Sequence, residues 1–256
     1  HTVAGAIDLV TAPIPDGEHV YADLAFGMYL SRKAHVRVSA SGDSFGVLLE
    51  GVHEANDGFK HIDGMPGADT GYSRNEVMGK ARVSFGNQES LLHDLELKLG
   101  FSNENSNETY LGLSDADFEV DPYRRYAASQ LDRMEWWRSQ IALTHTATRG
   151  SDLELKSTFY RHDLTRTWRK VNAFRGAAIA DVLRDPSAPR NALFYGVLTG
   201  EVDPSTTEET LLVGPNRRVF VSQGFQTKLD WRPKTGPVSH RIELGARIHH
   251  DSIRRL

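Results

Sequence analysis

The chain contains no cysteine among its 256 residues, which excludes disulfide frameworks and cysteine-based zinc or redox sites. A surplus of one charge is also missing, because 30 basic residues meet 34 acidic ones and leave a formal net charge of −4. This balance does not suggest nucleic-acid binding. No signal peptide is visible at His1, and we interpret both ends of the sequence as truncations.

Long hydrophobic runs are missing as well. The mean hydropathy is −0.45, and no apolar stretch approaches the ~20 residues that a membrane helix needs. A transmembrane β-barrel is not excluded by this, because its strands alternate lipid-facing and lumen-facing residues and average to near neutral. The period of the hydrophobic pattern must therefore separate a soluble protein from a barrel.

The sequence does contain apolar and polar residues that alternate with a period of two. The clearest case is the stretch 95–102, where Leu95, Leu97, Leu99 and Phe101 alternate with polar or small residues. The pattern predicts nine strands, at about 18–28, 34–42, 44–56, 75–86, 93–105, 132–147, 151–166, 217–231 and 238–252. Several of them exceed the usual ~5–6 residues of a soluble strand and suit a tilted crossing of a bilayer.

The connections between these strands alternate in length. Short connections lie at 42–43, 86–90, 149–150 and 232–237, and long ones at 57–74, 106–131 and 167–216. Outer-membrane barrels of bacteria have short periplasmic turns and long extracellular loops, which produce this alternation. We therefore predict an all-β fold, a partial transmembrane antiparallel β-barrel in which about nine meandering strands belong to a larger barrel.

Local helix signals and aromatic residues refine this prediction. Ser114 can cap a short helix in one long loop, and the segments 177–183 and 191–198 predict two more in the longest loop. Aromatic residues stand near expected strand ends, where barrels carry aromatic girdles. The girdle candidates are Tyr29, Trp136, Trp137, Trp168 and Trp231. The alternative is that they are ordinary strand aromatics.

Two stretches resemble a known family. Residues 2–11 resemble the strand that closes the plug of TonB-dependent outer-membrane receptors, although Ala4 and Asp8 depart from the pattern. Residues 108–118 with 121–130 resemble an extracellular loop of ferric dicitrate receptors. The resemblance implies that residues 1–15 are the end of the plug and residues 16–256 the first part of a barrel of about 22 strands. Nine strands cannot close such a barrel.

The resemblance also implies a function. Such a receptor sits in the outer membrane among lipid and lipopolysaccharide, binds a ferric chelate (a siderophore or a ferric citrate-like complex), and imports it with energy from TonB. TonB would act through a plug segment that is not in this sequence. We expect no enzyme activity, cofactor or resident metal. Vitamin, sugar or nickel uptake stay open as alternatives.

Arginine side chains are the natural candidates to bind an anionic chelate, because their planar fork donates paired hydrogen bonds to carboxylates. The candidates are Tyr123, Arg124, Arg125 and Tyr126 in one loop, and Arg166, Arg169, Lys170 and Arg175 at the start of the longest loop. The alternative is that they are solvated loop charges or contacts to lipopolysaccharide phosphates. The resemblance carries over no ligand contact by position.

Two other functions compete with active transport. The first is a passive pore or a structural or adhesive barrel, which needs no plug-like segment. The second is a secreted soluble β protein, a hydrolase that would use Ser44 in the G-x-S-x-G match at 42–46. A nucleophile elbow requires a helix after the serine, whereas alternation typical of a strand follows here. His249 and His250 are adjacent on a predicted strand and would point to opposite faces, which disfavours a metal site.

Overall fold

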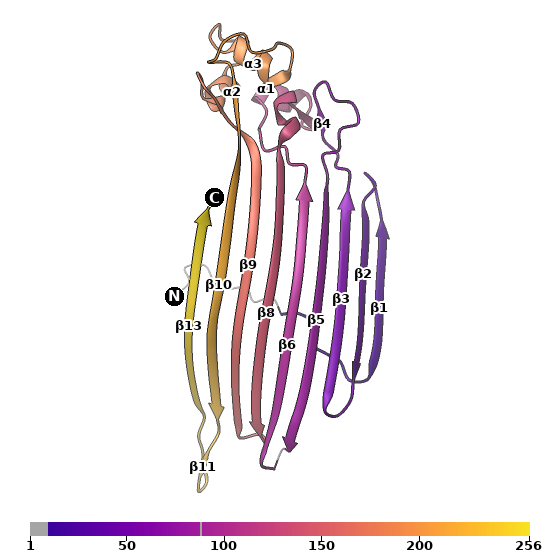
Figure 1. Cartoon of the computed structure of the whole chain (residues 1–256), viewed down its shortest axis with the longest axis vertical. Coiled ribbons are helices and arrows are strands. Elements are labelled where there is room, and N and C mark those ends of the chain that lie inside the picture. Colours follow the sequence, from indigo (N-terminus) through magenta and orange to yellow (C-terminus); the bar gives the residue numbers. More distant parts are fainter. Residues whose placement is uncertain (1–9, 88) are drawn as a thin grey trace.

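The computed structural model describes residues 10–87 and 89–256, which form one large antiparallel sheet with loops at one end (Figure 1). The sheet has nine strands in the order β1-β2-β3-β5-β6-β8-β9-β10-β13, so each strand pairs with its neighbour along the chain. The strands are β1 (Glu18–Phe26), β2 (Arg32–Ser41), β3 (Phe45–Asn56), β5 (Tyr72–Asn87), β6 (Leu91–Ser106), β8 (Arg133–Arg149), β9 (Leu153–Phe174), β10 (Leu211–Trp231) and β13 (Ile242–Arg255). The predicted nine-stranded meander is confirmed, and within the described residues β1 and β13 remain its two edges.

One end of the sheet carries the short turns. Between β2 and β3 the Gly42 amide donates to the Phe45 carbonyl at 2.9 Å, so Asp43 and Ser44 form a tight turn. A strand and not a helix follows Ser44, which is incompatible with a nucleophile elbow. The last of these connections contains a small hairpin that the sequence did not predict, β11 (Lys234–Thr235) with β12 (Val238–Ser239).

The opposite end carries all the long loops and their helices (Figure 1). They contain α1 (Asp115–Val120), a 3-10 helix η1 (Ala127–Leu131), α2 (Ile179–Arg184) and α3 (Ala192–Thr199). The expected cap is present, because the Ser114 side chain accepts a hydrogen bond from the Asp117 amide. Gly200 ends α3 with a left-handed φ of 80°. Among the described residues no helix is long and apolar enough to span a membrane.

The two faces of the sheet differ in polarity, because successive side chains of a strand point to opposite sides. Residues 10–15 lie against one face, where Ile14 packs on Leu48 and Met78 and the Lys80 ammonium donates to the Ala12 carbonyl at 2.8 Å. We call this side the polar face, since Glu50, Glu76, Lys98, Arg138 and His162 also line it. Residues 1–9, which hold most of the plug-like segment, lie outside the described residues.

The other side, here called the apolar face, exposes the alternating hydrophobic residues. Val38, Leu49, Val77, Leu99, Ile141, Phe159, Phe225 and Leu244 all lie on it and are between 39% and 61% exposed. They do not converge into an enclosed core, as they would in a soluble sandwich. The prediction that they share one face of a single sheet is confirmed.

The apolar residues form a band that runs obliquely across the strands. On β1 the band begins at Val20, and the register carries that position through Leu49 and Ile141 to His250 on β13. On β13, however, the band already begins at Ile242, eight residues before His250. Because eight strand-to-strand steps separate β1 from β13, the band shifts by roughly one residue per strand. With ~3.3 Å per residue and ~4.8 Å between strands, this slope corresponds to strands tilted by roughly 35°, which is typical of transmembrane barrels.

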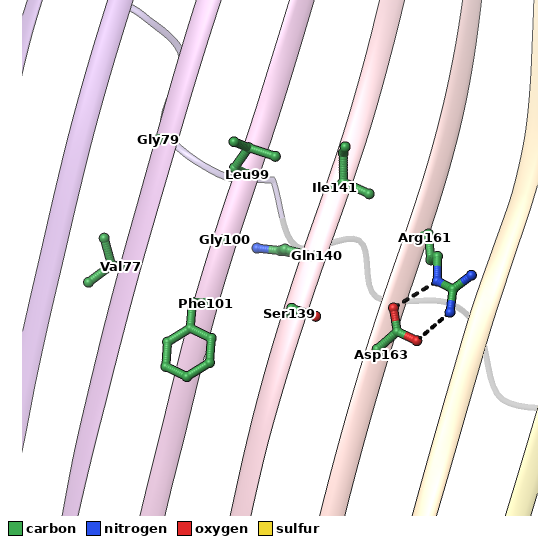
Figure 2. A pocket seen from close by; sticks show the side chains of 10 residues that line it. All are labelled: Val77, Gly79, Leu99, Gly100, Phe101, Ser139, Gln140, Ile141, Arg161 and Asp163. Carbon is green, nitrogen blue, oxygen red and sulfur yellow. Dashed lines mark hydrogen bonds and ion pairs between the residues drawn. The ribbon is translucent and has the colours of Figure 1, made fainter.

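Figure 2 shows a part of the apolar face near the border of this band toward the long loops, which lie beyond the lower edge of this view. Leu99 and Ile141 project from β6 and β8 beside a shallow depression of about 410 Å³, where Gly79 has no side chain. On β9 the Arg161 Nε and a carboxylate oxygen of Asp163 lie 2.8 Å apart. The two charges neutralise each other at the level where polar surface replaces the band on this strand.

Two strands are longer than predicted. β9 continues to Phe174 and β10 begins at Leu211, whereas the sequence placed 167–216 in a loop. The extra pairs extend to Leu211 with Phe174, past an irregularity near Leu212. The alternation that marks a strand requires one face in lipid or in a core. Both faces of this extension lack the apolar band, so the signal disappears although the hydrogen-bonded ladder continues.

Candidate functional site

The long loops are joined by a small hydrophobic core of their own. Phe174 at the end of β9, Leu198 of α3 and Val182 of α2 are 3% exposed or less, and Phe174 meets Phe194 with ring centroids 4.9 Å apart. The remaining buried members of this cluster are Leu111, Tyr126, Ala128, Val171 and Val197. The loop between β6 and β8 and the loop between β9 and β10 therefore pack together as one unit.

Asp117 on α1 is the polar centre of this loop unit. One of its carboxylate oxygens accepts hydrogen bonds from the hydroxyls of Tyr126 and Tyr195, both at 2.6 Å, and from Ser114 at 2.7 Å. The other oxygen accepts from the Arg124 guanidinium at 2.7 Å. Since Tyr195 lies on α3, this carboxylate links two loops that are far apart in the sequence.

Arg124 extends the connection to the third long loop. Its Nε and Nη2 each lie 3.0 Å from a carboxylate oxygen of Asp63, in the loop between β3 and β5. The backbone follows the same route, because β4 (His61–Ile62) pairs in parallel with β7 (Arg124–Arg125). All three long loops are thus held to one another by the chain Asp63–Arg124–Asp117–Tyr195.

The ionisation of these groups follows from their partners. Burial alone would raise the pKa of Asp117, but hydrogen bonds from Tyr126, Tyr195 and Ser114 together with the Arg124 charge hold it below its ordinary value. Hydrogen bonds from the Arg124 guanidinium to Asp63 raise the pKa of Arg124 despite its burial. Burial and the bond to Asp117 raise the pKa of Tyr195. Asp117 is therefore an anion and Tyr195 a neutral donor at neutral pH.

Asp132 joins the loop unit to β9 and behaves differently. Its Oδ1 accepts from the Val171 amide at 3.0 Å, whereas its Oδ2 is buried and has no partner among the described residues. Burial raises the pKa of Asp132 to about 6. The carboxyl can therefore change its charge near neutral pH at the base of the loop unit.

A cavity of about 500 Å³ opens beneath the loops on the β1 side. It is lined by the aromatic residues Tyr29, Phe59, Tyr72 and Tyr110 and by Lys60. The Lys60 ammonium donates to the Thr109 hydroxyl at 3.0 Å, and burial lowers its pKa. The cavity offers flat rings and one cation.

The predicted ligand residues in the loop between β6 and β8 have distinct environments. Tyr126 is 1% exposed and Arg124 is engaged by two carboxylates, so both stabilise the loops. Tyr123 is 55% exposed and meets Phe59 edge-on at 5.5 Å. The Arg125 guanidinium donates to the Pro122 carbonyl at 2.9 Å, and its burial lowers its pKa. These four residues are close in sequence but do not converge on one point.

The second group of candidates lies along β9 rather than in a loop. Arg166 is on the polar face, whereas Arg169 lies on the opposite side and donates to the Leu131 carbonyl at 2.6 Å. The Lys170 ammonium lies 3.6 Å from the centre of the Tyr110 ring. Arg175 follows the strand and is exposed. Because alternation separates Arg166 from Arg169, the structure does not bring these two together.

The aromatic residues named for a girdle divide between the two faces. Trp137 and Trp231 lie on the apolar face, 42% and 39% exposed. Trp136 pairs with Arg166 on the polar face, and Trp168 lies on that face against Tyr110. Tyr29 lies in the turn between β1 and β2 with a positive φ of 57°.

Sequence reasoning missed several residues that matter at this end. Asp63 and Tyr195 were not predicted at this site, and no local pattern marks them, because their partners, Arg124 and Asp117, are far away in the sequence. Arg218 on β10 and Arg255 on β13 were also missed. Arg218 belongs to a predicted strand, whereas Arg255 lies beyond residue 252, where the last predicted strand ends. Only the strand register shows that Arg218 stands directly beside Arg166 and that Arg255 stands beside Arg218 on the other side. Among the described residues there is no cluster of three or more metal-ligating side chains.

Comparison with known proteins gives a consistent result for the fold. Neither a protein-family model nor a curated protein sequence matches the chain. The solved structures do. The ferric-catecholate import receptor Fiu of Escherichia coli K12 matches in its open form with a TM-score of 0.62 and 12% identity, over 96% of this chain and 36% of that chain.

Two further structures agree. The closed form of Fiu gives a TM-score of 0.60 at 12% identity, over 94% of this chain and 32% of that one. The siderophore receptor PiuA of Acinetobacter baumannii gives 0.61 at 9% identity, over 94% and 31%. The chain has the fold of part of a TonB-dependent receptor barrel.

The TonB-dependent receptor fold explains the open sheet. The chain spans about a third of the length of the solved receptors that it matches, so its nine strands correspond to a part of their barrel wall. Edge strands present unpaired amides and carbonyls, and a barrel removes such edges by closing. The loop unit stands at one rim of this wall.

Proposed function

We propose that the chain belongs to a TonB-dependent outer-membrane receptor that binds a ferric chelate, a siderophore or a ferric citrate-like complex, and imports it with TonB-supplied energy. The observation that carries the proposal is the oblique apolar band. A band that shifts by roughly one residue per strand becomes level when strands tilt in a bilayer. The fold shared with two siderophore receptors adds the class of ligand.

The proposed parts follow the geometry. The loop unit faces the outside of the cell, and Trp137 and Trp231 with Tyr29 lie near the membrane interfaces, in contact with lipid and lipopolysaccharide. Residues 1–15 form the end of the plug. Ligand contacts come from the exposed Tyr123, from the half-buried Arg125 and from Arg166, whereas Arg124 and Tyr126 hold the loops that present them.

The alternative function, a passive pore or an adhesive barrel, leaves the polar face free. Here residues 10–15 lie across that face, with Ile14 6% exposed against Leu48 and Met78. A segment that covers the polar face, which would line the inside of a barrel, favours a plugged transporter over an open pore.

The test is iron uptake by cells that lack their other ferric receptors and express the full-length protein. We expect accumulation of radioactive iron from a ferric catecholate or ferric dicitrate that stops when TonB is deleted. A stable ion conductance in planar bilayers, together with uptake that is indifferent to TonB, would establish the pore instead.

A further inference from the structure

We propose that Arg166, Arg218 and Arg255 form an anion-binding row on the polar face, which receives a multivalent anion with flat aromatic groups below the loops. The three residues lie on the neighbouring strands β9, β10 and β13. Arg218 pairs directly with Arg166 on one side and with Arg255 on the other. The inference rests on the proposed function and names the part of the wall that a ligand would meet.

The charges along this row show why the three arginines stand out. The same row begins on β2 with Lys33 and continues through Glu54, Arg74 and Glu104 on the next strands. Opposite charges alternate there, as cross-strand pairs favour. Beyond Trp136 on β8, the next three positions of the row, on β9, β10 and β13, are all arginines. Like charges directly opposite one another are destabilising, so this arrangement calls for an anion.

No such anion is provided by the described part of the chain. Within residues 10–87 and 89–256, none of the three guanidinium groups forms an ion pair with a carboxylate. Arg218 donates from Nε to the neutral Asn216 at 3.0 Å. The Arg166 Nε is buried and has no hydrogen-bond partner among the described residues.

Within the residues that the structure describes, aromatic and aliphatic side chains, and not carboxylates, border the row of arginines. The Arg166 guanidinium lies 5.8 Å from the ring centres of both Trp168 and Phe220. Phe220 pairs with Leu164 and Ile253, so an apolar row borders the arginines on the side away from the loops. Trp168 borders them on the other side, and its indole Nε1 is also buried without a partner there.

These features select a ligand by chemistry. Three guanidinium groups at steps of about 5 Å suit a ligand with several negative oxygens, such as a ferric tris(catecholate) trianion. Its flat rings can stack on the indole and phenyl groups that border the row. Ferric dicitrate offers the charge without the rings. The row lies beyond Phe159, roughly 23 Å further along β9 toward the loops, where a ligand would arrive before passing the membrane.

The chain offers a matched control for the test. Arg217 and Arg254 precede Arg218 and Arg255 on the same strands but point to the opposite face. In the full-length receptor we expect R218Q/R255Q to weaken binding of ferric tris(catecholate) by about 10- to 100-fold. R217Q/R254Q should bind as the wild type does. Equal effects of the two double variants, or no effect of either, would overturn the proposal.

A second arm separates this inference from the proposed function. Trp168→Leu should lower affinity for ferric tris(catecholate) more than for ferric dicitrate, and an equal loss for both would contradict the role of the rings. If the wild type binds neither chelate, the proposed function fails. The anion site can then still be tested by modifying arginines with phenylglyoxal in the presence of trimetaphosphate. Protection of Arg218 and Arg255, but not of Arg217 and Arg254, would support the anion site. No selective protection would refute it.

Discussion

At the scale of single residues, one carboxylate organises the outer end of the molecule. Asp117 accepts four side-chain hydrogen bonds and touches residues from two loops directly and a third through Arg124. Hydrogen bonds to a charged group are stronger than neutral ones, and their loss leaves buried donors without partners. The mutual position of the loops therefore depends on a single ionised side chain.

We predict that Asp117→Asn loosens the loop unit. The amide removes the charge that holds Arg124 and the two tyrosine hydroxyls. Amide hydrogens of α1 and α3 should exchange about 10- to 100-fold faster, as measured by hydrogen–deuterium exchange of the full-length protein.

Asp115→Asn is the matched control, because Asp115 is in the same first helical turn but exposed. Equal exchange in the two variants would contradict the role given to Asp117. The pKa of Asp117 is held below its ordinary value of 3.8. The wild-type protection should thus be complete above pH 3.8 and disappear only as the pH falls through the lower folded value.

At the scale of elements, the strands show where sequence patterns are informative. Period-two alternation predicted all nine strands, because each has a stretch with one apolar and one polar face. The same signal failed beyond the band, where 167–174 and 211–216 continue as strand without a continuous apolar face and pack in part against the core of the loops. The two-residue bridge between β4 and β7 has no sequence signature, and the arginine row depends on a register that no single strand encodes.

The contrast between the faces predicts a difference between two positions of β8 that lie three residues apart. Leu143 lies on the apolar face between Leu97 and Phe159, whereas Thr146 lies on the polar face opposite Asp94. Leu143→Arg should cost about 2–4 kcal/mol of unfolding free energy in a bilayer. Thr146→Arg should cost little, because the polar face is not in lipid. Denaturant titration in vesicles measures both, and similar costs would mean that the apolar face does not meet lipid.

At the scale of the whole molecule, the register gives an orientation. The oblique band becomes level only if the strands lean by roughly 35° from the membrane normal. We predict this tilt for the complete barrel in oriented bilayers, measured by polarised infrared dichroism of the amide I band. Strands lying flat along the membrane, as in a protein bound to its surface, would contradict the transmembrane assignment.

The length of β9 and β10 has a mechanical consequence. Their shared ladder continues to Phe174 and Leu211, so α2 and α3 stand on a stiff two-stranded arm. Bending that arm would break backbone hydrogen bonds of a long ladder, whereas the loop between β3 and β5 is joined to its neighbours by a two-residue bridge and by side-chain contacts of Lys60, His61 and Asp63. If the loops at this end move relative to one another, we expect the loop between β3 and β5 to move while α2 and α3 keep their place on the extended β9–β10 ladder.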